Sequence, residues 1–268
     1  MINSSNHSSI EGLIKSYERD KAPFIEDTSI SFPERGIVFE ELVGLVKKFN
    51  EVLFNGIKPY IKDDGEVNEI VDRVTQTLPQ IRESMKKDVK AAYDGDPAAR
   101  GDYTMIIRAY PGFKTVLMQR VARVLYENNV HSYSRELMEE IHSLTGIDIH
   151  PGAKIGEYFF IDHGTGVVIG ETAEIGDWVR IYQGVTLGVL HFQKEGESNV
   201  LKKGYKRHPT IGNHVVIGTG AKLLGPIIVG NYVNIGANAW VQGNIPDNKK
   251  AYISEHPKLI MRENGPGK

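Results

Sequence analysis

The spacing of apolar residues divides the chain into two parts with different periods. In the first part, from about Glu34 to Thr145, apolar residues recur every three or four positions, which predicts helices with one buried face. One such run comprises Ile70, Val74, Leu78, Ile81, Met85 and Val89. Pro79 lies inside this run, and we expect it to kink the helix or to split it in two.

A second helical run follows the break signal Pro111–Gly112. It comprises Phe113, Val116, Leu117, Val121, Val124 and Leu125. Upstream, Asp96 and Pro97 have the form of a helix start, with Asp96 as the N-cap and Pro97 in the first turn. Residues 1–33 begin polar, and we expect them to be partly disordered.

After Gly146 the period changes to six. Aliphatic residues, once replaced by alanine, stand at Ile149, Ile155, Ile161, Val167, Ala173, Val179 and Val185. After an interruption the count resumes at Ile211, Ile217, Leu223, Val229, Ile235 and Val241. A period of six fits neither a helix nor a long strand. It indicates a solenoid in which each hexad is a short strand with a turn, and three hexads close one triangular coil.

These two patterns predict an α+β protein. A helical N-terminal domain would span residues 1–146, a parallel β-helix of hexapeptide repeats residues 147–250, and a C-terminal tail residues 251–268. The interruption, residues 191–210, would be an inserted loop. Insertions in solenoids form loops on one face, which is often the binding face.

Composition narrows the class of protein. Among 268 residues the formal net charge is −2, so no global charge attracts nucleic acid or an anionic membrane. The absence of cysteine removes disulfides, cysteine-ligated zinc and a cysteine nucleophile, and it fits a reducing compartment. No apolar run approaches the ~18 residues of a membrane span, and the polar N-terminus is no secretory signal. We therefore expect a cytoplasmic protein.

The candidate catalytic and binding residues lie in two segments. One is DHGTG at residues 162–166, in the third hexad, and the other is Arg207–His208–Pro209 at the end of the interruption. Taken singly, these residues have ordinary explanations as turn residues or solvated loop side chains. The tetrad Gly218–Thr219–Gly220–Ala221 is a weak phosphate-loop candidate, because no Gly-Lys-Ser or Gly-Lys-Thr follows it. The combination of these segments is more informative than any one of them.

In their order along the chain, these segments resemble serine O-acetyltransferase. The resemblance rests on DIHPGAKIGEYFFIDHGTGVVIGETAEIG at residues 148–176, on RHPTIGNHVVIGTGAKLLG at residues 207–225, and on DPAA at residues 96–99. It covers about residues 90–260 and implies a left-handed β-helix. It also implies acetyl-CoA as co-substrate, L-serine as acceptor, and O-acetylserine, the precursor of cysteine, as product, with no metal.

The resemblance assigns catalytic roles to three residues. His163 would be the general base, Asp148 its orienting carboxylate, and His208 would complete the pocket beside the serine hydroxyl. This chemistry is reasonable, because a serine hydroxyl is a poor nucleophile and a neutral histidine can accept its proton. A carboxylate behind the histidine fixes its tautomer and stabilises the imidazolium.

Substrate-binding roles follow in the same way. Asp96 and Asp162 would bind the serine ammonium, and Arg207 would hold the carboxylate, since arginine can bind a carboxylate bidentately. His208 would also bind the substrate, beside the hydroxyl. The positions implied for CoA are Gly188, Thr219, Gly220 and Ala237. Without a cysteine, direct transfer in a ternary complex is favoured, and an acyl-serine route stays open.

The sequence departs from the family pattern at three points. The connection that ends in RHP is longer than usual, DHATG is replaced by DHGTG, and the chain ends in GPGK without the isoleucine-terminated tail by which some relatives dock into O-acetylserine sulfhydrylase. We therefore do not expect a stable complex with that enzyme. Feedback inhibition by cysteine is implied by the resemblance alone.

Three other functions remain open at this stage. One is a hexapeptide acyltransferase for a sugar or amino-sugar; the second is a zinc carbonic anhydrase with His163, His208 and His214 as ligands. The third is a structural solenoid without enzymatic activity. Solenoids of this type usually trimerise, with active sites between neighbouring coils, so we expect a trimer or a dimer of trimers.

Overall fold

The computed structural model describes residues 39–100 and 103–254. The disorder expected for residues 1–33, the start of the helical pattern at Glu34 and the last residues of the tail lie outside this part. The described helices are α2 (Phe39–Ile57), α3 (Asp64–Gly95), α4 (Tyr103–Ala109), α5 (Pro111–Glu127) and α6 (His131–Thr145). None of the helices in the described residues is both long and apolar enough to cross a membrane.

The rest of the described chain forms strands of two or three residues. They are β1 (Asp148–Ile149), β2 (Lys154–Ile155), β3 (Phe160–Ile161), β4 (Val168–Ile169), β5 (Glu174–Ile175), β6 (Arg180–Ile181), β7 (Thr186–Gly188), β8 (Thr210–Ile211), β9 (Val216–Ile217), β10 (Lys222–Leu224), β11 (Ile228–Val229), β12 (Asn234–Ile235), β13 (Trp240–Val241) and β14 (Lys250–Ala251). All pair in parallel with strands one coil away. The predicted α+β fold, a helical part followed by a left-handed parallel β-helix, is confirmed.

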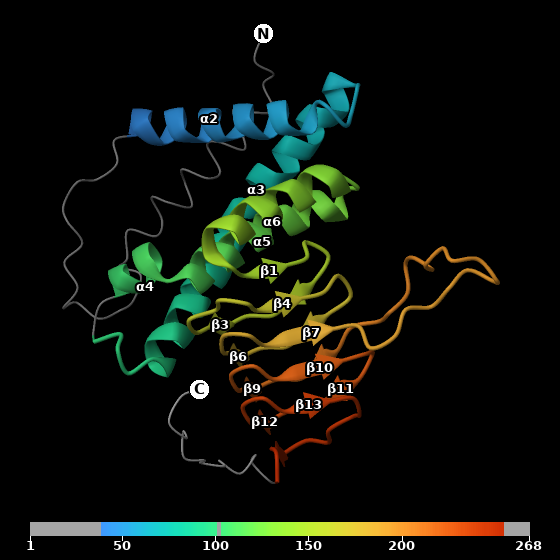
Figure 1. Ribbon diagram of the computed structural model, residues 1–268. Helices are drawn as coiled ribbons and strands as arrows, with labels where there is room; N and C mark the ends of the chain where they lie inside the picture. Colours follow the sequence, from blue (N-terminus) through green and yellow to red (C-terminus); the bar gives the residue numbers. More distant parts are fainter. Residues whose placement is uncertain (1–38, 101–102, 255–268) are drawn as a thin grey trace, which may run out of the picture.

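The β-helix has three sheets, which we call A, B and C. Sheet A has the strand order β1-β4-β7-β10-β13, sheet B the order β2-β5-β8-β11 and sheet C the order β3-β6-β9-β12-β14. Because the chain visits A, B and C in turn, the connections form three corners of a triangular column, A/B, B/C and C/A. Figure 1 shows the helices stacked on the first coil, and the inserted segment between β7 and β8 projecting from the column.

The core of the column is built from the hexad positions. The second residue of most strands points inward, and successive coils stack these residues in register, as Ile149 on Ile169 and Ile169 on Leu187. All three side chains are almost completely buried. Burial of aliphatic side chains coil upon coil is the main stabilising contribution in such a solenoid.

The hexad phase was predicted wrongly at one place. Ile149 pairs with Ile169, whereas Ile169 pairs with Leu187, so the first coil is two residues longer than the second. Val167, Ala173, Val179 and Val185 therefore lie at corners rather than in strands, whereas the positions predicted from Ile211 onward do lie in strands. The slip was invisible in the sequence because strand and corner positions both point inward and both accept small aliphatic residues. The longer corner is C/A, the connection that contains His163.

For the helices, one of two alternatives is excluded and one expectation needs correction. Pro79 does not split its helix, because α3 continues through it from Asp64 to Gly95. Asp96 is not an N-cap but caps the end of α3: its backbone N–H donates to the carbonyl of Ala92 (2.9 Å), and its side chain accepts from the N–H of Ala98 (2.8 Å). Aspartate favours turns as well as N-caps, so the sequence alone could not distinguish the two.

The helical part covers the open end of the β-helix. The first coil would otherwise expose unpaired backbone carbonyls, as any sheet edge does. Side chains of α5 satisfy them: Gln119 donates to the carbonyl of Ala153, Arg120 to that of Gly156 and Arg123 to that of Gly152, each at 2.8 Å. The helices therefore hold the coil that carries Asp148 and His163.

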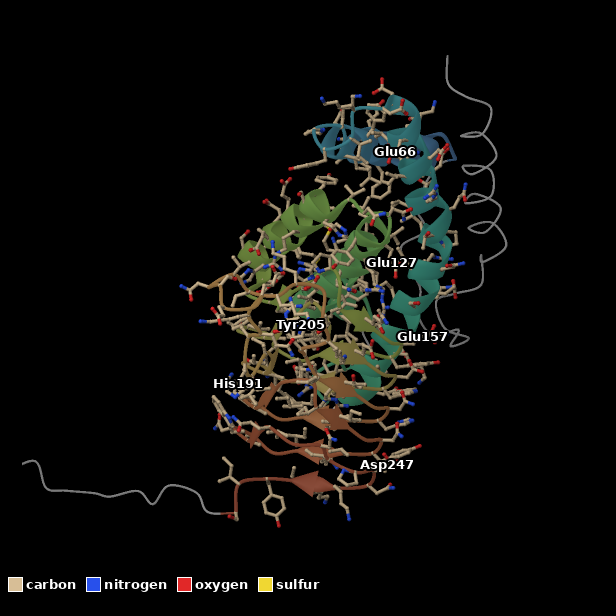
Figure 2. All side chains as sticks on the ribbon, turned by 90° about the vertical axis from the view of Figure 1, so that its right-hand side faces the viewer. Glu66, Glu127, Glu157, His191, Tyr205 and Asp247 are labelled. Atoms are coloured by element: carbon tan, nitrogen blue, oxygen red, sulfur yellow. The ribbon has the colours of Figure 1, made fainter. Side chains whose placement is uncertain are left out.

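The B/C corner carries two side-chain ladders. Asp177 accepts a hydrogen bond from the N–H of Glu157, and the pattern repeats in the following coils. The neighbouring positions stack the rings of Tyr158, Trp178, His214 and Tyr232. In Figure 2, Glu157 and Asp247 mark this corner, while His191 and Tyr205, which belong to the inserted segment, lie along a different edge. We assign the ladders to coil stacking.

Candidate active site

His163 stands at the C/A corner, in the longest of the turns that join sheet C to sheet A. Its backbone is left-handed, with φ of 57°, and its side chain is 72% exposed. Gly164 follows with φ of 87°, and a side chain there would overlap Ile147, so glycine is required. Residues at the B/C corner, such as Trp178, have the same left-handed backbone, so the conformation belongs to the fold. What distinguishes His163 is that its ring is free to reach a ligand.

Two carboxylates accompany His163. Its Nε2 atom lies 3.8 Å from Oδ1 of Asp162. Asp148 begins sheet A beside the same corner, but its Oδ1 accepts from Nη1 of Arg135 at 3.2 Å, and no contact with His163 is formed. The structure therefore brings Asp148 to the right corner without the predicted His163–Asp148 pair. Apo enzymes often show catalytic hydrogen bonds that are long or unformed.

Asp96 reaches the same corner from the end of α3. Tyr110, at the start of α5, donates a hydrogen bond from its hydroxyl to Oδ2 of Asp96. Burial, this hydrogen bond and the negative charges of Asp96 and Asp162 raise the pKa of Tyr110 to about 12. The ring of Tyr110 stacks on Phe160, two residues before Asp162, with 6.4 Å between ring centroids, so both carboxylates lie in one neighbourhood and form a negative site suited to an ammonium group.

Three of the four predicted CoA positions lie along the C/A corner below His163. Thr219, Gly220 and Ala237 belong to connections between sheets C and A, and the coils are joined there by hydrogen bonds such as that from the N–H of Gly220 to the carbonyl of Gln183 (2.9 Å). Gly184 stacks directly on Gly220, so two successive coils lack a Cβ atom at this position of the corner. Such a surface allows a linear chain to approach the backbone closely.

Gly188 and Gln183 lie at opposite edges of sheet A. Gly188 ends β7 at the A/B edge, so it does not join the other CoA positions within one chain. The Oε1 atom of Gln183, at the C/A corner, is buried and has no hydrogen-bond partner within the described residues. A buried acceptor of this kind is costly unless a donor arrives, and an amide N–H of a bound ligand would be one.

His208 lies at the A/B corner and is 6% exposed. Its Nδ1 accepts from the N–H of Thr172 (3.1 Å) and contacts the Thr172 hydroxyl (2.9 Å), which assigns the proton to Nε2. Burial, followed by the positive charge of Arg207, lowers the pKa of His208 to about 4. His208 is therefore a neutral hydrogen-bond donor at physiological pH.

Arg207 is held at the same corner by residues that the sequence interpretation left without a role. One carboxylate oxygen of Glu171 accepts from Nη2 of Arg207, and the other accepts from the hydroxyl of Tyr126 at 2.7 Å. Burial opposes ionisation of Glu171, but the hydrogen bonds from Tyr126 and Arg207 outweigh it and lower its pKa. Glu171 and Thr172 stand in the GETA segment, a polar pair in a hexad turn, which is the signal that could have identified them.

The predicted site residues therefore fall into two groups at different corners. Asp96, Asp162 and His163 gather at C/A, whereas Arg207 and His208 gather at A/B, and the full width of sheet A lies between them. Helix α5 runs from one group to the other: Tyr110 precedes its first residue and Tyr126 lies in its last turn, a separation of ~24 Å. One amino acid cannot contact both groups of the same chain.

The three histidines considered for zinc lie at three corners. His163 is at C/A, His208 at A/B, and His214 at B/C, where it stacks between Trp178 and Tyr232. No two of them share a corner. The chain therefore does not assemble the three-histidine zinc site that the sequence left open.

A parallel coil of hexapeptide repeats with an exposed corner histidine fits the class of hexapeptide-repeat acyltransferases. Residues 208–243 match the family model described as bacterial transferase hexapeptide (six repeats). Among the relatives, a serine acetyltransferase of Helicobacter pylori is 51% identical over 168 residues, which cover 63% of this chain and 91% of that protein. The chain belongs to the serine acetyltransferase family, and it is an acyltransferase.

Two further comparisons agree. A plasmid-encoded serine acetyltransferase of Synechococcus elongatus is 50% identical over 179 residues; the alignment covers 67% of this chain but only 56% of that relative. The solved structure of serine acetyltransferase isoform 3 from Entamoeba histolytica superimposes with a TM-score of 0.84 at 43% identity, covering 97% of this chain and 96% of that one. The similarity thus includes the helical part as well as the coil.

Proposed function

We propose that this enzyme transfers the acetyl group of acetyl-CoA to the hydroxyl of L-serine, with His163 as the general base. The observation that carries the proposal is the pair of oppositely charged groups on the two edges of sheet A. Asp96 and Asp162 suit an ammonium group, and Arg207 suits a carboxylate, which together describe an α-amino acid. His163, beside the carboxylates, would then face the hydroxyl.

The site forms between two copies of the chain. Because the two groups lie on opposite edges of sheet A, a ring of three columns would bring the C/A corner of one copy against the A/B corner of the next. Such a ring is closed, repeats one heterologous interface and yields three equal sites. A single chain would bind only one end of serine. We therefore favour a trimer as the minimal active unit.

The chemistry proceeds by direct transfer. His163 removes the serine hydroxyl proton as the oxygen attacks the thioester carbonyl carbon, and backbone N–H groups of the coil stabilise the oxyanion. The carbon–sulfur bond then breaks, and the departing CoA thiolate takes a proton from the His163 imidazolium. Asp148 would stabilise that imidazolium after exchanging Arg135 for His163. His208, as a neutral donor, would hydrogen-bond a serine oxygen.

Solved relatives support the choice of ligands. One serine acetyltransferase structure, 33% identical with a TM-score of 0.60, is a complex with CoA, and one from Neisseria gonorrhoeae, 26% identical with a TM-score of 0.60, is a complex with serine. In this chain acetyl-CoA would lie along the glycine corner that ends at Gly220, with Gln183 as a hydrogen-bond acceptor. The Entamoeba structure contains cysteine, so we expect cysteine to compete with serine here.

Release of CoA thiol tests the proposal. Purified protein would be mixed with acetyl-CoA and a thiol reagent, with L-serine, L-threonine, an amino-sugar or no acceptor added. The protein itself has no cysteine, so the background is low. We expect release that requires L-serine and is lost in His163→Ala. Release only with the amino-sugar would show that the acceptor has been assigned wrongly, and release with no acceptor present would show hydrolysis instead of transfer.

A further inference from the structure

The hydrogen-bonded row Tyr126–Glu171–Arg207 at the A/B corner has a geometry that neither coil packing nor the proposed chemistry requires. The two oxygens of the Glu171 carboxylate serve different partners, Tyr126 on Oε1 at 2.7 Å and Arg207 on Oε2. An isolated glutamate beside an arginine usually binds it through both oxygens, in the bidentate fork–fork pair. Here the tyrosine occupies one oxygen, so Glu171 contacts Arg207 through the other.

This arrangement leaves Arg207 able to bind a second carboxylate. A guanidinium has five N–H donors. One Arg207 nitrogen donates to Glu171, and another donates to the carbonyl of Tyr205 at 3.4 Å, which leaves three donors without a partner among the described residues. A bidentate pair with Glu171 would use a further donor and would cover one edge of the guanidinium. The tyrosine thus determines how much of Arg207 is available to the substrate.

The row is also fixed in space. The side chains of Glu171 and Arg207 are 27% and 20% exposed, and Tyr126 lies in the last turn of α5. Close by, Arg123 donates to the carbonyls of Gly152 and Ala153, which holds this end of α5 on the first coil. The position of Arg207 therefore depends on the helical part as well as on the coil that carries it.

We propose that Glu171 and Tyr126 are positioning residues for recognition of the serine carboxylate. Glu171 orients the Arg207 guanidinium, and Tyr126 limits Glu171 to one oxygen so that Arg207 keeps donors for the substrate. The inference rests on the proposed function and names the part of the site that distinguishes an α-amino acid from an uncharged alcohol. It attributes no contact with the reacting atoms to either residue.

Two variants test the row. Glu171→Gln keeps the size of the side chain, but it removes the negative charge and leaves one acceptor oxygen in place of two. Tyr126→Phe removes only the hydroxyl, and it frees Glu171 to bind Arg207 through both oxygens. Each change weakens the hold on the substrate carboxylate, so we expect the KM for L-serine to rise by about 10-fold in either variant. The kcat and the KM for acetyl-CoA should stay within about 2-fold, since neither residue touches the reacting atoms.

L-Serinamide separates carboxylate recognition from a general loss of structure. It keeps the ammonium and the hydroxyl of serine but lacks the carboxylate charge. We expect the ratio of kcat/KM for L-serine to kcat/KM for L-serinamide to fall by about 10-fold in Glu171→Gln and in Tyr126→Phe. If Glu171→Gln also lowers the melting temperature, Tyr126→Phe tests the same row with the loss of a single oxygen atom.

Matched pairs elsewhere in the chain supply the controls. Tyr60 donates to Glu136, and Lys87 pairs with Glu157 at 2.6 Å, both away from the two corners of the site. Tyr60→Phe and Glu157→Gln should leave the ratio unchanged. If the wild type is active and both Glu171→Gln and Tyr126→Phe keep the wild-type ratio of the two kcat/KM values, the inference alone is overturned. A wild type that does not acetylate L-serine would overturn the proposed function, and the inference with it.

Discussion

The ion pair between Asp88 and Arg120 gives the most quantitative prediction for stability. Asp88 on α3 is 4% exposed and Arg120 on α5 is 11% exposed. Oδ2 of Asp88 accepts from Nη2 (2.7 Å) and Nε (3.2 Å) of Arg120, and Oδ1 accepts from the N–H of Phe159 (2.8 Å). The pair therefore links two helices to the first coil of the β-helix.

Asp88→Asn removes the charge and keeps the volume. Loss of one member of a buried ion pair leaves the other charge without compensation, which costs about 3–5 kcal/mol in free energy of unfolding. Arg120 cannot escape into solvent without giving up its hydrogen bond to the carbonyl of Gly156. The matched control is Glu157→Gln. It breaks the half-exposed pair with Lys87 and should cost about 0–1 kcal/mol.

Chemical denaturation at one fixed protein concentration measures both variants. The fixed concentration matters because an oligomer's apparent stability depends on it. We also expect Asp88→Leu combined with Arg120→Met to recover only part of the loss, since the carbonyl of Gly156 would lose its donor. The reasoning would be refuted if Asp88→Asn cost no more than Glu157→Gln.

Three further predictions concern the site. Gly170→Ala places a Cβ atom on the ring of His208, so kcat/KM for L-serine should fall by at least about 10-fold while circular dichroism stays unchanged; an unaltered kcat/KM would contradict the assigned position of His208. His163→Ala should lower kcat by about 10²–10⁴-fold, as steady-state kinetics would show, and a smaller loss would exclude it as the base. The pKa of His208 is lowered to about 4 by burial, so on acidification the unfolded state takes up the proton first. The free energy of unfolding should therefore fall by about 1–3 kcal/mol between pH ~6.5 and ~4, and it should fall less in His208→Gln. If the free energy of unfolding depends on pH equally in both proteins, His208 is not buried in its neutral form.

Much of the fold could be predicted because the solenoid repeats one pattern, an aliphatic side chain at each inward-pointing position. Ile149, Ile169 and Leu187 stack because inward positions recur with little variation, so periodicity alone predicts the column. The two extra residues around His163 escaped notice because Val167 satisfies the same rule at a corner. Asp96 was misassigned because the same residue type caps a helix at either end.

The site was predicted less completely, for a physical reason. The histidines and Arg207 stand in recognisable segments, but their partners come from distant parts of the chain. Tyr110 precedes α5 and Tyr126 lies near its end, outside the apolar stripe, and nothing in their spacing indicates that their hydroxyls will donate hydrogen bonds to Asp96 and Glu171. Nor does the sequence show that the site residues occupy two corners, because that division follows from which sheets each connection joins.

The rate of serine-dependent CoA thiol release by mixed oligomers tests the central claim most directly. His163→Ala and Arg207→Ala would each be inactive alone and would be denatured, mixed in equal amounts and refolded together. In a ring of three copies, each mixed trimer contains one site with both residues intact, so random mixing should restore about a quarter of the wild-type rate. A mixture that stays as inactive as its components, while refolded wild type acetylates L-serine, would contradict a site shared between two chains.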